Sequence, residues 1–546
     1  MIQKNLLVAA VMLGVVTFGQ TKNTTIENRP KLMVGIMVDQ MRWDYLYRFE
    51  KHFSEGGLKR MMKDGYAFHN VMIDYVPTVT AIGHASVYTG SVPSIHGIAG
   101  NDWIDRETGK SRYVTTDTSV KGVGASSEKI GAHSPRSLWS TTITDQLGIA
   151  TGFKSKIVGV SLKDRASILP AGHNPLGAFW FDEGTGNFIT SSYYMDSLPN
   201  WLVDFNNAKV GEKLVSQGWN TIKPISEYTE STRDDVPWEG LIGSATKPTF
   251  PYANLKNDYQ KNKGVIRTTP FGNTLTLSAA QAAIDGYKMG DDDITDFLVI
   301  NLASTDYVGH TFGVNSIEVE DTYIRMDRDL EQFFNYLDKK IGKGNYTVFL
   351  TADHGAAHSV GYMQENKMAT GYFAEGWEKE LPIAIEKEFG ASNLLLGVDN
   401  YQIYLDHRAI EDKGLELEAV KDFVLKYAKS QKDVLYAIDL NDIGDSPVPS
   451  LIKERVINGY NWQRSGDIQL VSLDGMLPSY AKKGTTHSVW NSYDAHIPLL
   501  FMGKGIKHGS SVKPYHMSDI ASTVAQLLKI ENPSGSIGNP IVEIME

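Results

Sequence analysis

Two segments of the sequence place carboxylates and imidazoles at spacings that suit metal-assisted chemistry. Asp306 and His310 stand four residues apart, so their side chains share one face if this segment is helical. Asp353 and His354 follow an apolar run at 346–350 that is typical of a buried strand. Carboxylate oxygen and imidazole nitrogen suit zinc in a site without thiolate. Either segment alone could still be an ordinary capping pair.

Two more potential ligands follow or precede apolar runs elsewhere in the chain. Asp39 ends the run 31–38, which is typical of a strand buried on both faces of a parallel sheet. Open α/β sheets bind their ligands at the carboxyl ends of such strands, although Asp39 could instead cap a helix that starts near Met41. His487 lies in a loop ahead of the run 497–502. We therefore expect both side chains at one edge of a sheet.

Thr80 stands where a loop meets residues 81–88, which have helical spacing and small side chains. Its hydroxyl could be an ordinary helix cap. A helix N-terminus also favours negative charge, such as an alkoxide or a phosphoryl group. The complete set of polar residues favours a nucleophile, because it suits two ions about 4 Å apart, the arrangement used for in-line displacement at phosphorus. That set is Asp39, Thr80, Asp306, His310, Asp353, His354 and His487.

Two cations, Lys163 and Arg165, follow a further apolar run at 156–161. Charges after a strand are often solvated surface groups. At the carboxyl edge of a sheet, however, an arginine fork and a lysine point charge could hold phosphate oxygens. Both interpretations remain open from these residues alone.

Taken together, these motifs resemble the alkaline phosphatase superfamily over nearly the whole chain. The matching segments are Val38-Asp39, Pro77–His84, Thr89-Gly90 with Ile95–Gly97, Asp306–His310, Thr351–Gly355 and Thr486-His487. The region of Thr80 is most similar to the nucleotide pyrophosphatase/phosphodiesterase branch. A threonine combined with Lys163-Asp164-Arg165 resembles the PafA type of periplasmic alkaline phosphatase.

The resemblance implies two zinc ions and a set of phosphate contacts. One zinc would be bound by Asp306, His310 and His487. The other would be bound by Asp39, Asp353, His354 and the Thr80 oxygen. The non-bridging phosphate oxygens would be held by Asn101, Lys163 and Arg165. Three other histidines of these segments are expected to be structural, with core hydrogen bonds: His84, His96 and His358.

Charge balance favours a phosphate monoester as the substrate. Two zinc ions, three aspartates and an ionised Thr80 have a net charge of zero. Lys163 and Arg165 would then neutralise a monoester dianion, whereas a diester monoanion would leave one excess positive charge. A closed site of low dielectric penalises such an imbalance. We therefore predict an alkaline phosphatase that acts through a phosphothreonine intermediate on small-molecule phosphate monoesters, with broad specificity for phosphate scavenging.

Other functions fit the sequence less well. A phosphodiesterase or nucleotide pyrophosphatase is compatible with Thr80 and the zinc ligands, but Lys163 and Arg165 argue against it. Sulfatase chemistry uses a modified cysteine or serine in a different motif, and a phosphoglycerate mutase of this superfamily is built around serine. A non-catalytic binding protein on the same scaffold would need a broken motif, and every motif is intact.

Composition limits the class of protein and its partners. The 546 residues are 42% hydrophobic and 21% charged, as in ordinary globular proteins, and the net charge of −11 argues against general nucleic-acid binding. The absence of cysteine excludes disulfides, thiolate ligands and a lipid-acceptor cysteine. Residues 1–20 resemble an export signal, with Lys4 ahead of an apolar run at 6–18 that is short for a membrane span. We expect a periplasmic monomer without a membrane anchor.

The elements that must position these residues indicate an α/β fold. Apolar runs at 31–38, 156–161, 296–302 and 346–350 predict buried strands, and 319–337 predicts a long amphipathic helix. With the resemblance, we expect an alkaline-phosphatase-like three-layer fold with a central, mostly parallel sheet, spanning 21–546. An inserted α+β subdomain is predicted at 390–475, and the aromatic-rich part of 170–290 is expected to form loops over the site.

Overall fold

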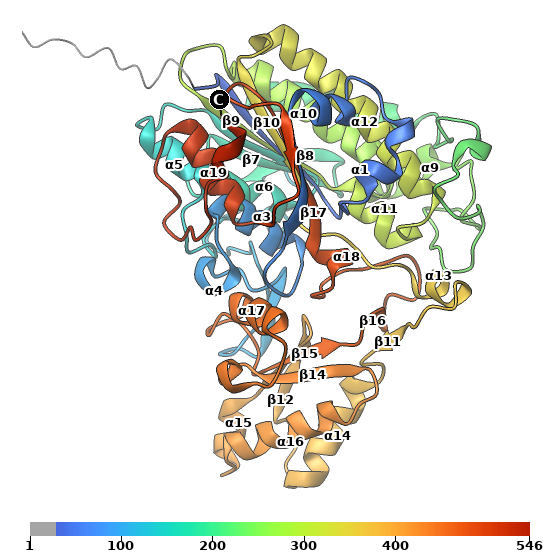
Figure 1. Ribbon diagram of the computed structural model, residues 1–546, viewed down its shortest axis with the longest axis vertical. Helices are drawn as coiled ribbons and strands as arrows, with labels where there is room; N and C mark the ends of the chain where they lie inside the picture. The colour runs from blue at the N-terminus through green and yellow to red at the C-terminus, as the bar shows by residue number, and fades with distance from the viewer. Residues whose placement is uncertain (1–28, 546) are drawn as a thin grey trace, which may run out of the picture.

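A twisted central sheet organises the computed structural model, which describes residues 29–545; the expected export signal at 1–20 lies outside this part. Five of its strands run parallel to one another (Figure 1). In spatial order they are β10 (Tyr346–Thr351), β1 (Leu32–Val38), β9 (Asp296–Leu302), β6 (Ile157–Ser161) and β7 (Gly177–Asp182). The expectation of a central, mostly parallel sheet is confirmed.

Antiparallel strands extend the sheet on both sides. β17 (His496–Gly503) pairs antiparallel with β10, and β2 (Tyr66–Met72) pairs antiparallel with β17. The short strands β18 (Gly509–Ser511) and β19 (Tyr515–His516) pair with β2. On the other side, β8 (Asn187–Ser191) pairs antiparallel with β7, and β5 (Gly122–Val123) pairs with β8.

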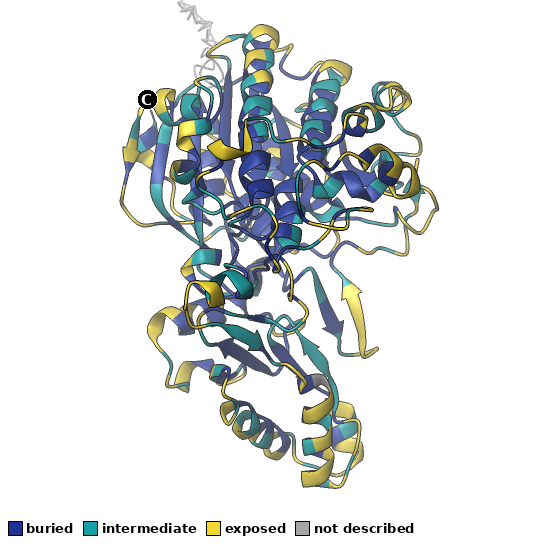
Figure 2. Cartoon of the chain, turned by 90° about the vertical axis from the view of Figure 1, so that its right-hand side faces the viewer, coloured by how far each residue is buried: buried dark blue, intermediate teal, exposed yellow. Residues whose placement is uncertain are grey.

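Helices cover both faces of the sheet, which gives three layers (Figure 1). One layer contains α3 (Thr80–Thr89), α5 (Ile143–Ala150), α6 (Asp164–Ala171) and α19 (Asp519–Leu528). The other contains α10 (Phe271–Tyr287), α11 (Ser304–Phe312) and α12 (Ile317–Leu337). Every residue of β1, β9 and β10 is buried, because the helices exclude water from both faces. In Figure 2 the middle of the main body is accordingly mostly dark blue. No helix among residues 29–545 combines the length and apolarity that a membrane crossing requires.

The aromatic segment near residue 180 corrects one expectation. The residues at 179–181 lie in β7 and therefore belong to the central sheet and not to loops over the site. α7 (Asn200–Asn207) and α8 (Val210–Val215) then pack against α10. Continuous burial on both faces explains why this strand lacks the alternating pattern that would have identified it.

A second, four-stranded sheet lies apart from the central one (Figure 1). Its antiparallel order is β12 (Leu395–Asp399), β13 (Gln402–Leu405), β15 (Ile468–Ser472) and β14 (Val434–Asp439). It packs with α14 (Trp377–Phe389) and α16 (Leu417–Lys429) around an apolar cluster of its own, which begins at Phe373. We call these elements the inserted unit. The chain leaves and re-enters the main body beside the parallel pair β11 (Gly371–Phe373) and β16 (Met476–Pro478).

Candidate active site

The polar residues singled out from the sequence meet at one edge of the central sheet. Asp39 follows β1, and Asp353 follows β10; both are fully buried. Asp306 and His310 lie one turn apart on α11, which begins just after β9. Because these strands are parallel neighbours, their carboxyl ends deliver the side chains to the same place.

Thr80 is not a helix cap. Val79 is the N-cap of α3, and Thr80 is its first helical residue. The Thr80 hydroxyl accepts a hydrogen bond from Lys163 Nζ at 3.3 Å. The Thr80 hydroxyl forms no capping hydrogen bond with α3. It lies instead among the charged residues at the N-terminus of this helix.

Lys163 joins the carboxylates to the Thr80 hydroxyl. Its ammonium lies 2.9 Å from Asp39 Oδ2 and 2.7 Å from Asp306 Oδ2. The side chain is only 3% exposed, which excludes the alternative of a solvated surface charge. Burial opposes its charge, but the two carboxylates outweigh burial and raise the pKa of Lys163. Lys163 is therefore a fixed cation beside the hydroxyl.

Three imidazoles present the same nitrogen to the site. His310 Nδ1 lies 2.8 Å from the carbonyl oxygen of Thr485, and His487 Nδ1 lies 2.7 Å from that of Thr78. His354 Nδ1 lies 2.9 Å from its neighbouring Gly355 carbonyl oxygen. An Nδ1–H that donates to a carbonyl leaves the Nε2 lone pair free, which is how metal-binding histidines are commonly oriented.

The Nε2 atoms face the carboxylates. His310 Nε2 lies 3.0 Å and His487 Nε2 3.7 Å from Asp306 Oδ1. His354 Nε2 lies 3.4 Å from Asp353 Oδ2 and 3.8 Å from Asp39 Oδ1. These separations match the edges of a coordination sphere with zinc–ligand distances of about 2.0–2.2 Å.

The ligand atoms also lack other partners. Asp39 Oδ1, Asp353 Oδ2 and His354 Nε2 are buried and form no hydrogen bond with any described residue. Among the expected ligands, two triplets have ligand atoms within 4.8 Å of one another: Asp39 with Asp353 and His354, and Asp306 with His354 and His487. Buried polar atoms are almost always paired, so these atoms fit a pair of metal ions.

The ionisation of the site suits metal binding. Burial lowers the pKa of His354 to about 4 and also lowers that of His487, so both rings are neutral at neutral pH. Burial and the charge of Asp39 raise the pKa of Asp353. Burial alone would also raise that of Asp306, but His310 and Lys163 outweigh it and lower the pKa. A crowded group of carboxylates with neutral imidazoles favours a divalent cation.

Arg165 and Asn101 lie beside this centre. Arg165 Nη1 donates to the hydroxyl oxygen of Tyr113 at 3.0 Å, and both lie on the wall of a cavity that also contains Lys163. Asn101 Oδ1 accepts a hydrogen bond from the amide of Ala81 at 2.9 Å. Because Oδ1 accepts this bond, the Nδ2 amide group of Asn101 points the other way and, among the described residues, its N–H donors are free to bind a ligand. Asn101 is thus oriented by the residue after Thr80, and Arg165 by Tyr113.

Some contributors to the site were not anticipated from the sequence. Gln40 donates from its backbone to Asp353 Oδ1 at 3.1 Å and from Nε2 to Asp306 Oδ1 at 2.7 Å. The Tyr307 ring lies 5.1 Å from Lys163 Nζ, a cation–π distance. Their positions next to Asp39 and Asp306 in the sequence were the available signal. Tyr113 had no comparable signal.

The remaining histidines of these segments differ in their surroundings. Both ring nitrogens of His96 form hydrogen bonds, to the Ser86 hydroxyl and the Ile98 amide. His358 Nδ1 lies 2.6 Å from Asn315 Oδ1. His84 is closer to the centre, because its Nδ1 lies 2.9 Å from the Thr80 carbonyl oxygen and 3.5 Å from Asp353 Oδ2.

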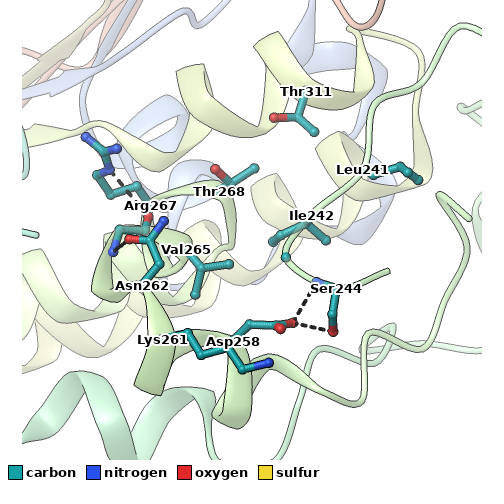
Figure 3. Close-up of a pocket in the computed structure, with 12 residues that line it drawn as sticks. Leu241, Ile242, Ser244, Asp258, Lys261, Asn262, Val265, Arg267, Thr268 and Thr311 are labelled. Carbon is teal, nitrogen blue, oxygen red and sulfur yellow. Dashed lines mark hydrogen bonds between the residues drawn. The ribbon is translucent and has the colours of Figure 1, made fainter. Parts of the chain in front are cut away.

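Two cavities flank α11. One of about 370 Å³ is lined by Lys163, Arg165, Tyr307 and Arg267 among others. Another of about 460 Å³ shares Arg267 and reaches Thr311, the residue after His310; in Figure 3 its wall includes Asp258 hydrogen-bonded to Ser244. The first cavity borders the phosphate-binding candidates, whereas the second holds none of the expected site residues.

Comparisons with known proteins agree with this geometry. Residues 33–495 match the family model described as type I phosphodiesterase / nucleotide pyrophosphatase. The chain is 63% identical over 539 residues to alkaline phosphatase PafA of Elizabethkingia meningoseptica, covering 99% of this chain and 98% of the relative. It is 48% identical over 518 residues to alkaline phosphatase PhoV of Synechococcus elongatus, covering 95% and 93%. The crystal structure of wild-type PafA superposes with a TM-score of 0.94 at 64% identity, covering 95% of this chain and 99% of that one.

Proposed function

Because this chain belongs to the type I phosphodiesterase / nucleotide pyrophosphatase family and is an alkaline phosphatase that hydrolyses phosphate monoesters, we propose that it does so with two zinc ions and a phosphothreonine intermediate. The observation that carries the proposal is the set of buried, unpartnered ligand atoms beside the Thr80 hydroxyl. Aspartate and imidazole without thiolate suit zinc.

The ligands divide into two groups around Thr80. One zinc would be held by Asp306, His310 and His487, and the other by Asp39, Asp353, His354 and the Thr80 oxygen. His354 lies close enough to both sets of carboxylates to belong to either group, and its 3.4 Å approach to Asp353 favours the group that contains Asp39 and Asp353. When bound, the zinc pair supplies Lewis acidity that lowers the pKa of the attacking hydroxyl and stabilises the departing oxygen.

Thr80 is the nucleophile. Its hydroxyl gives its proton to solvent, and Oγ1 attacks phosphorus in line, so that a bond between Oγ1 and phosphorus forms while the bond from phosphorus to the ester oxygen breaks. The alcohol leaves with a proton from solvent. Water then attacks the phosphothreonine, the bond to Oγ1 breaks, Oγ1 regains a proton from the attacking water, and inorganic phosphate is released. Two inversions at phosphorus give net retention.

Lys163, Arg165 and Asn101 hold the non-bridging phosphate oxygens. Arg165 offers a planar fork of donors and Lys163 a point charge, and Asn101 donates through its amide. The transition state of phosphoryl transfer spreads negative charge over these same oxygens. Two fixed cations match a dianion better than a monoanion, and this difference selects monoesters over diesters.

We also propose that the protein is exported to the periplasm and acts there as a monomer. The support for export is the sequence of residues 1–20, in which Lys4 precedes the apolar run at 6–18. Broad phosphate scavenging from small esters fits such a location.

Turnover of an aryl phosphate and of the matching aryl methyl phosphate diester tests the proposal. We expect monoester hydrolysis to dominate, to stop with a chelator and to return with added zinc. Trapping a phosphoenzyme that maps to Thr80 would support the intermediate. Dominant diester hydrolysis, or full turnover after metal removal, would contradict it.

A further inference from the structure

The hairpin of β3 (Asp102–Asp105) and β4 (Lys110–Tyr113) carries one phosphate-binding candidate and holds another. Asn101 immediately precedes β3, and its carbonyl accepts the amide of Val114, just past β4, at 2.9 Å. At the end of β4, the Tyr113 hydroxyl accepts a hydrogen bond from Arg165 at 3.0 Å. The base of one hairpin therefore sets the place of both Asn101 and Arg165.

Tyr113 is itself fixed from the other side. Its hydroxyl donates to Asp164 Oδ1 at 2.7 Å, which leaves the oxygen lone pairs to accept from Arg165. Thr115 donates to the second oxygen of Asp164 at 2.5 Å. Within residues 29–545, the Tyr113 hydroxyl is the only hydrogen-bond partner found for Arg165. A shift of the hairpin would therefore move the guanidinium.

The turn of the same hairpin is anchored in the inserted unit. Arg106 donates to Asp467 Oδ2 at 3.2 Å and to the Ser465 carbonyl at 2.9 Å. Its guanidinium lies 5.7 Å from the ring centre of Tyr404 in β13. Asp467 is only 3% exposed and also accepts the amide of Leu405 at 2.7 Å. Arg106 thus binds a buried carboxylate of the inserted unit.

A second contact lies at the base of the hairpin. Asn400, in the turn between β12 and β13, donates from Nδ2 to the carbonyl of Asp102 at 2.9 Å. Its amide also packs on Gly100, where a Cβ atom would lie only 2.6 Å from Asn400 Nδ2. Gly100 is the residue before Asn101. The inserted unit therefore touches the backbone on both sides of Asn101.

We propose that the inserted unit positions the phosphate-binding side chains, with Asn400 and Arg106 as positioning residues that act through the β3–β4 hairpin. The inference rests on the proposed roles of Asn101 and Arg165. Within residues 29–545, neither positioning residue forms a hydrogen bond or ion pair with a metal-ligand candidate, so their effect falls on the phosphate donors. The insertion then contributes to the reaction and is more than an addition to the fold.

The contacts predict a selective kinetic defect. In Asn400→Ala and Arg106→Gln, we expect kcat/KM for the monoester to fall between about 10-fold and 100-fold, because misplacement by about 1 Å costs this much. Inhibition by inorganic phosphate should weaken in parallel. Diester hydrolysis, which uses the dianion contacts less, should change by less than about 3-fold. Metal content should equal that of the unsubstituted enzyme.

A matched control is available elsewhere in the chain. Arg233 forms an ion pair with Glu365 at 2.7 Å and lies 5.8 Å from the Trp238 ring, so it makes the same kinds of contact as Arg106. Arg233→Gln should leave the monoester-to-diester ratio unchanged. Tyr113→Phe, which removes one hydroxyl, should reproduce the selective defect if Arg106→Gln fails to fold.

The decisive measurement is a double-mutant cycle between Arg106→Gln and Arg165→Ala. Once Arg165 is gone, Arg106→Gln should cost the monoester much less than it costs in the parent enzyme, because coupled residues are not additive. Additive effects, or equal losses for monoester and diester, would overturn the proposal. If Arg165→Ala alone leaves monoester hydrolysis intact, the proposed phosphate contact is wrong as well. If Arg165→Ala is damaging and Arg106→Gln and Tyr113→Phe are not, the positioning role alone is refuted.

Discussion

Removing the phosphate-binding cations should change the preference between monoester and diester more than it changes catalysis as a whole. The relevant variants are Arg165→Ala, Lys163→Ala and the double variant. Lys163 lies within 3.3 Å of the Thr80 hydroxyl, and Arg165 lies on the wall of the adjacent cavity. Both cations attract the second negative charge that a monoester has and a diester lacks.

Coulomb's law gives the size of the effect. One unit charge at 4 Å from a cation is stabilised by about 4 kcal/mol at an effective dielectric constant of about 20. Because Arg165 is partly exposed, its contribution is about 2 kcal/mol, which corresponds to a change of about 30-fold in the monoester-to-diester ratio of kcat/KM. Lys163 is buried, and about 4 kcal/mol corresponds to about 1,000-fold. The double variant should thus lose a factor of at least about 1,000 in the monoester-to-diester ratio of kcat/KM.

The assay compares kcat/KM for an aryl phosphate and its methyl diester under the same conditions. Lys163 also pairs with Asp39 and Asp306, so its loss will perturb the carboxylates. Metal content and unfolding temperature must therefore be measured on each variant, and Arg165→Ala serves as the variant without that complication. A rise in salt should reduce the ratio in the parent enzyme only modestly, because Lys163, which contributes the larger part, is buried.

Equal losses for the two substrates would refute the charge argument. A ratio that stays within a factor of about 3 of the parent enzyme is smaller than a 1 kcal/mol effect and would show that the cations do not distinguish a dianion from a monoanion. The selectivity for monoesters would then have to come from the shape of the site.

Three further predictions follow from the same structure. Thr80→Ala should abolish the trapped phosphoenzyme and most turnover, whereas Thr80→Ser should retain both; undiminished turnover in Thr80→Ala would remove its role as nucleophile. Metal analysis should find about two zinc ions per chain, and chelation should lower the unfolding temperature because the clustered carboxylates lose their cations; one ion or none would contradict the assignment. The hydrogen bond from His173 to Asp145 raises the pKa of His173 and helps to lower that of Asp145. This pair stabilises the fold fully below the unfolded pKa of His173 and loses its effect as pH rises through the raised folded value. His173→Gln should therefore cost more unfolding free energy at pH 5.5 than at pH 8.5 in urea titrations, and a larger cost at pH 8.5 would reverse the sign of the argument.

The sequence revealed the central strands and the residues at their ends for a common physical reason. A strand buried on both faces must be continuously apolar, so the polar residue that ends the run is conspicuous, as at Asp39 and Asp353. Parallel pairing then brings such ends together without further information. The four-residue spacing of Asp306 and His310 also predicted their proximity correctly, because both lie on one side of α11.

Expectations failed where the signal depended on the surroundings. Thr80 looked like a cap, but the cap position belongs to Val79, because the helix starts at Thr80, one residue earlier than a cap at Thr80 would require. Residues 179–181 looked like a loop because aromatics near turn formers are ambiguous, yet they form a strand of the central sheet. In both cases tertiary packing decided the local structure, and the local sequence pattern did not show its effect.

The partners that orient the phosphate-binding residues show why a sequence cannot reveal all of a site. Arg165 and Tyr113 are separated by 52 residues, Asn400 and Asp102 by 298, and Arg106 and Asp467 by 361. An arginine in a hairpin turn and an asparagine in a β-turn are unremarkable locally, since both residue types are common there. Their meaning comes from what the fold brings against them. Residues that contact the substrate carry a pattern set by chemistry, whereas the residues that position them can be recognised only when the distant segments have been placed side by side.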